Sequence, residues 1–247
     1  MTDVLVGVHQ PNFFPWLGYF DKLARADVFI LQDDVQFARR HGGGGNWVNR
    51  VRILVAGAAA WITIPVRREN GPLQTIAELE IANQMPWRSQ LLRKLKAQYG
   101  RAPHFPEAME LLAPTIEFST DSLSEFNVHA ISSLAASLDV MPRSIVRQSA
   151  LGVKGHATSL LVDLVKAVGG TAYLTGDGAD GYLEPEKFGD ARIRLEFQRF
   201  RHPEYSQGID AFVPGLSVID ALMHCGLSGV RDMLQRSRVA RTANEPA

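Results

Sequence analysis

The chain contains very little cysteine: Cys225 is the only one in 247 residues. A single cysteine excludes an intramolecular disulfide framework and any zinc site built from several cysteines, and it fits a reducing compartment. Cys225 follows Ile219, Leu222 and Met223 on an apolar helical stripe. We therefore interpret it as a core residue rather than a nucleophile.

Net charge and long apolar runs are also missing. Lys+Arg and Asp+Glu each number 26, so charge gives no reason to expect a nucleic acid or an anionic membrane as partner. No apolar stretch reaches membrane-spanning length, and residues 1–3 lead into a short apolar run without the pattern of a signal peptide. We expect a cytoplasmic protein with no nucleic-acid partner and no membrane partner.

The apolar content that is present predicts one α/β domain. Hydrophobic residues make up 46% of the chain, which is enough for a sizeable core. Apolar runs at 4–8 and 28–31 enclose a helical repeat, a β-α-β pattern typical of a parallel pair. We predict a mostly parallel sheet flanked by helices over residues 1–234, with a helical C-terminal part, an antiparallel β-meander inserted at about 48–82, and a mobile polar tail at 235–247.

Polar residues follow three of the predicted strands. His9 and Gln10 follow the first strand, residues 32–34 follow the second, and Gly176 and Asp177 follow a strand at 171–175. If these strands are parallel neighbours, their polar ends converge on one crevice. Prolines at 11 and 15 stiffen the turn after His9. The alternative is an aromatic turn that only closes the end of the core.

Asp33 and Asp34 are adjacent carboxylates, and in an extended chain they would point in opposite directions. A carboxylate beside His9 would orient the imidazole and raise its basicity, as general-base chemistry requires. We choose Asp33 for this role, and a structural ion pair is the alternative. A metal site is not expected, because no helical His pair or Cys cluster supports one.

Several other side chains are candidate substrate contacts. Arg50 would supply a bidentate fork for a carboxylate or phosphate, or pair with an aspartate. The glycine-rich segment 176–182 offers exposed amides at a strand end, and a plain turn is the alternative. The substrate-binding candidates are Gln10, Asn12, Gln36, Asn49, Arg50, Asp177, Tyr182, Tyr205 and Gln207. The glycines at 42–45 lack the Lys-Ser/Thr of a P-loop, so we interpret them as a flexible loop or lid.

An ordered set of motifs resembles the WbqC-like protein family. The motifs cover the chain from about residue 6 to 226 and comprise HQPNFFPWLG at 9–18, DDVQF at 33–37, Asn49-Arg50, YLTG at 173–176, Tyr182-Leu183, Tyr205 with Gln207, and LSVID at 216–220. One departure is the segment 39–47, which is longer than the link usual in the family. A different substrate would be consistent with this longer link.

The resemblance implies a bacterial biosynthetic protein of O-antigen, other surface-polysaccharide or natural-product pathways. It supports His9, Gln10, Asp33, Gln36, Asn49, Arg50 and Tyr182 as shared positions. We predict a transferase that moves an acyl or aminoacyl group to an amine or hydroxyl, with His9 as general base and Asp33 orienting it. The partner would be a small-molecule substrate such as a nucleotide-sugar or a carrier-bound acyl donor.

Two alternatives belong to different classes. A histidine after the first strand of a β-α-β unit is loosely similar to nucleotidylyltransferase folds, in which such a residue meets a triphosphate. The other alternative is a non-catalytic metabolite-binding or scaffold protein. ATP binding with release of pyrophosphate would favour the first, and unchanged product formation in a folded His9→Ala variant would favour the second.

Overall fold

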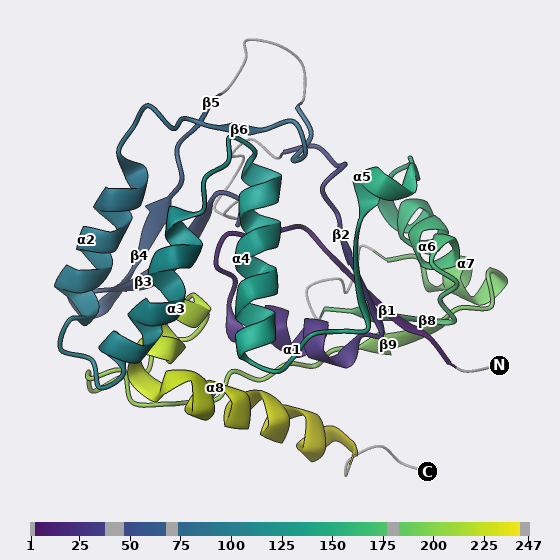
Figure 1. The fold of residues 1–247 in the computed structure, drawn as a ribbon. Helices are drawn as coiled ribbons and strands as arrows, with labels where there is room; N and C mark the ends of the chain where they lie inside the picture. The colour runs from purple at the N-terminus through teal and green to yellow at the C-terminus, as the bar shows by residue number, and fades with distance from the viewer. Residues whose placement is uncertain (1–2, 38–46, 68–73, 177–182, 243–247) are drawn as a thin grey trace.

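A computed structural model describes residues 3–37, 47–67, 74–176 and 183–242, with side chains described up to residue 236. Its centre is a five-stranded parallel sheet in the order β7-β2-β1-β8-β9 (Figure 1). The strands are β1 (Leu5–His9), β2 (Val28–Leu31), β7 (Ser144–Arg147), β8 (Ala172–Thr175) and β9 (Arg194–Phe197). The predicted α/β class with a mostly parallel sheet is confirmed.

The strand order places a topological switch point beside β1. From β1 the chain adds β2 and then β7 on one side, and later β8 and β9 on the other. Neighbouring connections therefore leave β1 and β8 in opposite directions, which opens a crevice beyond their carboxyl ends. His9 ends β1 and Thr175 ends β8, so both residues lie at this crevice.

Strand side chains alternate between two covered faces of the sheet. Val6 and Val8 share a core cluster with Leu164 of α6 (Ala157–Ala167) and Phe188 of α7 (Pro185–Asp190). On the other face, Phe29 belongs to a larger cluster that includes α1 (Leu17–Arg25), α4 (Leu123–Ser137) and α8 (Val218–Thr242). Burial on both faces explains why these strands read as continuous apolar runs.

The antiparallel part lies on the α1 side of the sheet with α2 (Trp87–Tyr99) and α3 (Phe105–Glu117) (Figure 1). β3 (Arg50–Val55) and β4 (Ala58–Thr63) form a hairpin, and β5 (Val66–Arg67) pairs with β6 (Glu80–Ile81). Gly57 has φ +80° in the hairpin turn, a conformation that glycine adopts without strain. The expected antiparallel strands are present, as two separate pairs.

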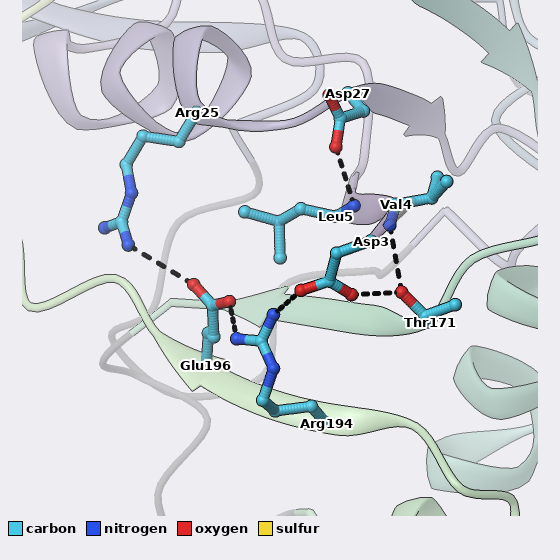
Figure 2. Close-up of polar contacts among 8 residues, drawn as sticks. All are labelled: Asp3, Val4, Leu5, Arg25, Asp27, Thr171, Arg194 and Glu196. Atoms are coloured by element: carbon cyan, nitrogen blue, oxygen red, sulfur yellow. Dashed lines mark hydrogen bonds and ion pairs between the residues drawn. The ribbon is translucent and has the colours of Figure 1, made fainter. Parts of the chain in front are cut away.

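The amino ends of the parallel strands carry polar groups that satisfy one another (Figure 2). The backbone N–H of Leu5 donates to Asp27 at 2.8 Å, and that of Val4 donates to Thr171 Oγ1 at 2.9 Å. Ion pairs then link the strands to each other and to α1, and they involve Asp3, Arg25, Arg194 and Glu196. The polar groups at the amino ends of the strands are therefore paired with one another.

The C-terminal helix α8 packs on α1 and α3. Gly226 interrupts it with φ +66°, where the sequence predicts a helix stop, and a second helical stretch continues to Thr242. Thus the helix extends beyond residue 234, where we predicted that the domain ends. None of the helices in the described part of the chain combines the length and apolar character needed to cross a bilayer.

Candidate functional site

A cavity of about 1180 Å³ lies at the carboxyl ends of β1 and β8. Its walls come from the ends of these strands, from α1, from the segment after β2, from the start of α6 and from residues 198–202. A volume of this size accommodates a ligand as large as a nucleotide. Open α/β sheets bind their ligands at this position.

His9 reaches the cavity from the end of β1. Its Nδ1 lies 3.2 Å from the carbonyl oxygen of Gln10, and its ring makes edge contacts with Tyr19 at 4.8 Å and Trp16 at 5.6 Å. Burial, together with the positive charge of Lys22, lowers the pKa of His9 to about 3. The imidazole is therefore neutral at pH 7. When Nδ1 donates to Gln10, Nε2 keeps a lone pair that can accept a proton.

Lys22 on α1 is the second notable group in the cavity wall. Its side chain is buried, and Nζ donates to the carbonyl oxygen of Val8 at 2.8 Å and lies 5.8 Å from the ring centre of Tyr173. Burial lowers the pKa of Lys22 to about 7, because the ammonium form loses hydration. The amine is thus poised to gain or lose a proton near neutral pH.

The two adjacent aspartates have different surroundings. Asp34 lies in the cavity wall and forms an ion pair with Lys154. Asp33 is fully buried, and its oxygens accept hydrogen bonds from Ser149 N and Oγ at 2.9 Å and from Ser124 Oγ at 3.3 Å. The group that contacts His9 Nδ1 is the carbonyl of Gln10, so an orienting role for Asp33 stays a prediction.

Other predicted substrate contacts are distributed between the cavity and the core. Gln10 and Gln36 line the cavity with His9. Asn12 is buried and lies outside the cavity lining, and Asn49 donates to the carbonyl oxygen of Ile64 at 3.0 Å in the antiparallel part. The guanidinium of Arg50 lies 4.2 Å from the ring centre of Trp61. The structure therefore does not bring Asn12, Asn49 and Arg50 to the cavity lining.

Tyr205 and Gln207 belong to a group of hydrogen-bonded side chains that we call the Asp220 cluster: Tyr99, Tyr205, Gln207 and Asp220. Tyr205 is half-buried, and the other three are buried. Asp220 accepts from Tyr99 at 2.8 Å, from Tyr205 at 2.8 Å and from Gln207 at 2.9 Å. The spacing of Ser217 and Asp220 predicts a capping box, but these contacts use the carboxylate of Asp220 instead. The cluster satisfies its own hydrogen bonds and lies outside the cavity lining.

Two predicted contacts, Asp177 and Tyr182, and the glycines at 42–45 lie outside the described residues. Gly176 and Leu183, on either side of the 177–182 segment, both line the cavity. The roles of Asp177 and Tyr182 therefore stay predictions.

Sequence reasoning missed several residues of the cavity wall: Lys22, His156, Tyr173, Gln198 and His202. Lys22 follows Tyr19 by three positions, so both lie on the same face of α1. A lysine in the last turn of a helix is otherwise easily taken as a solvent-exposed partner of the helix dipole. The signal that was available is its place between the buried residues Phe20 and Leu23.

The first turn of α6 also faces the cavity, through Gly155, His156, Ala157 and Thr158. No side chain caps this helix. In contrast, the described residues contain no group of three or more His, Cys, Asp or Glu side chains that would hold a metal ion. The described wall offers, among other groups, the neutral imidazole of His9, the amine of Lys22 and the backbone amides at the start of α6.

Comparison with known proteins agrees with the motifs. The WbqC-like protein family matches residues 10–232. The chain is also 30% identical over 223 residues to the uncharacterized protein Rv1507c of Mycobacterium tuberculosis, an alignment that covers 90% of this chain and 94% of that protein. No solved structure matches the chain. This α/β protein belongs to the WbqC-like protein family.

Proposed function

We propose that this protein is a bacterial biosynthetic transferase that moves an acyl or aminoacyl group to an amine or hydroxyl of a small molecule. The observation that carries the proposal is the neutral imidazole of His9 in the wall of the large cavity at the switch point. Family membership and a mycobacterial relative support a bacterial origin. We place the activity in surface-polysaccharide or natural-product pathways and in the cytoplasm.

His9 would act as the proton acceptor. The amine or hydroxyl of the acceptor attacks the carbonyl carbon of the donor, and its proton passes to His9 Nε2. The bond to the leaving group then breaks, and the leaving group takes the electron pair and the proton from His9. A hydrogen bond from Nδ1 to the Gln10 carbonyl holds the ring in the tautomer that this step needs.

Lys22 affects the basicity of His9. Its positive charge is one cause of the low pKa of His9, so an imidazolium is unfavourable while Lys22 is charged and unopposed. A bound anionic group near Lys22 would offset this repulsion and raise the pKa of His9. His9 would thereby be a stronger base in the complex with substrate than in the empty protein.

The proposal is tested by mass spectrometry with a panel of donors and acceptors. Acyl-coenzyme A and aminoacyl adenylates are combined with UDP-linked amino sugars, and the purified protein is compared with His9→Gln. We expect an acylated product and a rate about a hundredfold lower in His9→Gln. His129→Gln is the matched control, because His129 stacks on Phe118 and lies outside the cavity lining.

Equal rates in the protein and in His9→Gln would remove His9 as the base. Binding of a panel compound without any turnover would favour a metabolite-binding protein instead.

A further inference from the structure

Lys22 is a buried amine without a carboxylate partner in the described part of the chain. The residue is 3% exposed, and of the three N–H bonds of its ammonium form one has an acceptor among the described residues, the carbonyl of Val8. A buried ammonium group normally pairs with an anion, because desolvation is otherwise uncompensated. Lys22 instead lines the cavity, where a ligand would supply that anion.

The amino end of α6 lines the same cavity. His156 precedes this helix of 11 residues, and no side chain caps it. The N–H groups of Ala157, Thr158 and Ser159 lack hydrogen-bond partners among the described residues, as expected for an uncapped first turn. Free N–H groups at the amino end of a helix, where the helix dipole is positive, bind phosphate groups well.

The charges of the cavity wall also favour an anion. Besides Lys22, the titratable groups of the wall are His9, Tyr19, Asp34, His156, Tyr173 and His202. Asp34 is the only carboxylate among them, and its ion pair with Lys154 already neutralises it. The described wall therefore offers a positive charge and uncapped amides with no unpaired negative group.

We propose that the cavity binds a phosphate-bearing ligand of about nucleotide size, whose phosphate groups contact Lys22 and the uncapped amides at the start of α6. Phosphate fits better than carboxylate, because it has enough oxygens and charge to use an ammonium group and several backbone amides together. The volume of about 1180 Å³ leaves room for the remainder of the ligand beside His9. This inference rests on the proposed function only for the location of the site.

Proton uptake distinguishes this contact from nonspecific binding. The pKa of Lys22 is about 7 in the empty cavity, so at pH 8 most molecules carry the neutral amine. A phosphate beside Lys22 favours its charged form, so binding at pH 8 takes up about 0.9 proton. Calorimetry in buffers of different ionisation enthalpy measures this number with UDP, whose phosphate groups are ionised at pH 8. Pyrophosphate serves as a second probe of binding alone, and succinate is the carboxylate probe.

Lysine variants separate charge from protonation. Lys22→Arg keeps a permanent positive charge, so it is expected to bind UDP without the proton uptake. Lys22→Met removes the charge and is expected to weaken binding about thirtyfold or more. Because Lys22→Met also leaves the carbonyl of Val8 without its donor, thermal denaturation checks that this variant is folded. If Lys22→Met is not folded, the test rests on Lys22→Arg.

A matched pair tests the start of α6. Ala157 is exposed and has φ +50°, a conformation that Asp and Asn tolerate better than most residues. Ala157→Asp places a carboxylate where the phosphate would lie, and it is expected to weaken binding about tenfold or more. The neutral Ala157→Asn has nearly the same shape and is expected to weaken binding much less.

The results expected are millimolar or tighter binding of pyrophosphate or UDP, proton uptake that disappears in Lys22→Arg, and a difference between the two Ala157 variants. No binding of either phosphate probe would overturn the inference, as would binding that Lys22→Met and Ala157→Asp leave unchanged. Preferential binding of succinate would overturn the phosphate assignment. Phosphate binding without any acyl transfer would contradict only the proposed function.

Discussion

The cavity at the ends of β1 and β8 and the Asp220 cluster both contain residues that sequence patterns mark as candidate ligand contacts. They differ in how their hydrogen bonds are used. In the Asp220 cluster, one carboxylate accepts from two tyrosines and a glutamine, and each of these contacts lies within the protein. In the cavity, Lys22 and the first turn of α6 keep donors unused by the described residues.

The difference teaches how to distinguish structural polar groups from ligand-binding ones. A buried polar group that is fully paired stabilises one packing arrangement, and replacing it lowers stability. A buried polar group that faces a cavity without full pairing costs stability in the empty protein and is retained for binding. Substitutions in the Asp220 cluster should therefore lower stability more than ligand binding. Substitutions in the cavity should weaken ligand binding more than they lower stability.

The largest effect on stability is expected from Asp220→Ala. This change removes the acceptor of Tyr99, Tyr205 and Gln207 and leaves the buried donors of Tyr99 and Gln207 without this partner, so we expect a loss of about 3 kcal/mol or more in the free energy of unfolding. Urea denaturation measures it. Asp220→Asn retains an acceptor oxygen and should lose less. A loss below about 1 kcal/mol in Asp220→Ala would mean that the cluster does not stabilise the fold.

The next largest effect on stability is expected at the adjacent residues Asp33 and Asp34. Asp33→Ala removes an acceptor of three hydrogen bonds in the core, and we expect a loss of about 2 kcal/mol or more. Asp34→Ala removes only a pair with the exposed Lys154, and we expect a loss below about 1 kcal/mol. The same urea titrations compare the two variants. Equal losses would contradict the assignment of Asp33 to the core and Asp34 to the cavity.

These two aspartates also show where sequence reasoning reached its limit. The strands at 4–8 and 28–31, the helix between them and the histidine at the strand end were predictable, because apolar periodicity sets them. The direction of Asp33 was not, because the backbone turns after Leu31, with Asp33 N donating to the Leu31 carbonyl, and local pattern does not reveal Ser124 and Ser149 as partners.

The Asp220 cluster was unpredictable for a related reason. Tyr205 and Gln207 follow a strand in a proline-containing segment, a pattern that also suits a ligand contact. Their acceptor Asp220 lies on α8, and the third donor, Tyr99, lies on α2, far away in the sequence. The place of Lys22 among apolar residues of α1 was a signal for burial, but its position at the cavity depends on the tertiary fold, which turns this side of α1 toward the end of β1.

Below pH 7, the dependence of the free energy of unfolding on pH should reveal the environment of His9 in the cavity wall. The pKa of His9 is about 3 in the folded protein and close to 6.5 when unfolded, so the unfolded chain binds more protons between these values. Stability contributed by neutral His9 is therefore lost as the pH falls below about 6.5, by about 1 kcal/mol per pH unit. Urea titrations from pH 7 to pH 4 measure it.

His9→Gln should lose less stability over this range than the unmodified protein does. His202 and His224 also have lowered pKa values, and they add a slope that both proteins share. Parallel stability curves for the protein and His9→Gln would show that His9 titrates normally and is not held neutral by its surroundings.

A smaller effect of the same origin is expected for Lys22 at alkaline pH. Its pKa is about 7 when folded and near 10.5 when unfolded, so the unfolded chain binds more protons between pH 7 and 10.5. Stability should therefore rise with pH, by about 1 kcal/mol from pH 7 to pH 8, and Lys22→Met should not show this part of the rise. Urea denaturation of the protein and of Lys22→Met at pH 7 and pH 8 measures this difference. An equal rise in the variant would contradict a cavity-buried amine.

One nuclear magnetic resonance titration compares the two regions directly, because a histidine lies in or beside each of them. His9 lies in the cavity wall, and His224 lies 4.0 Å from Asp220. The account predicts that the His9 imidazole stays neutral at pH 5 and that its resonances shift when UDP or pyrophosphate is added, while those of His224 do not move. A His9 ring that titrates near pH 6.5, or ligand shifts at His224 and none at His9, would contradict the claim that the cavity is the functional site.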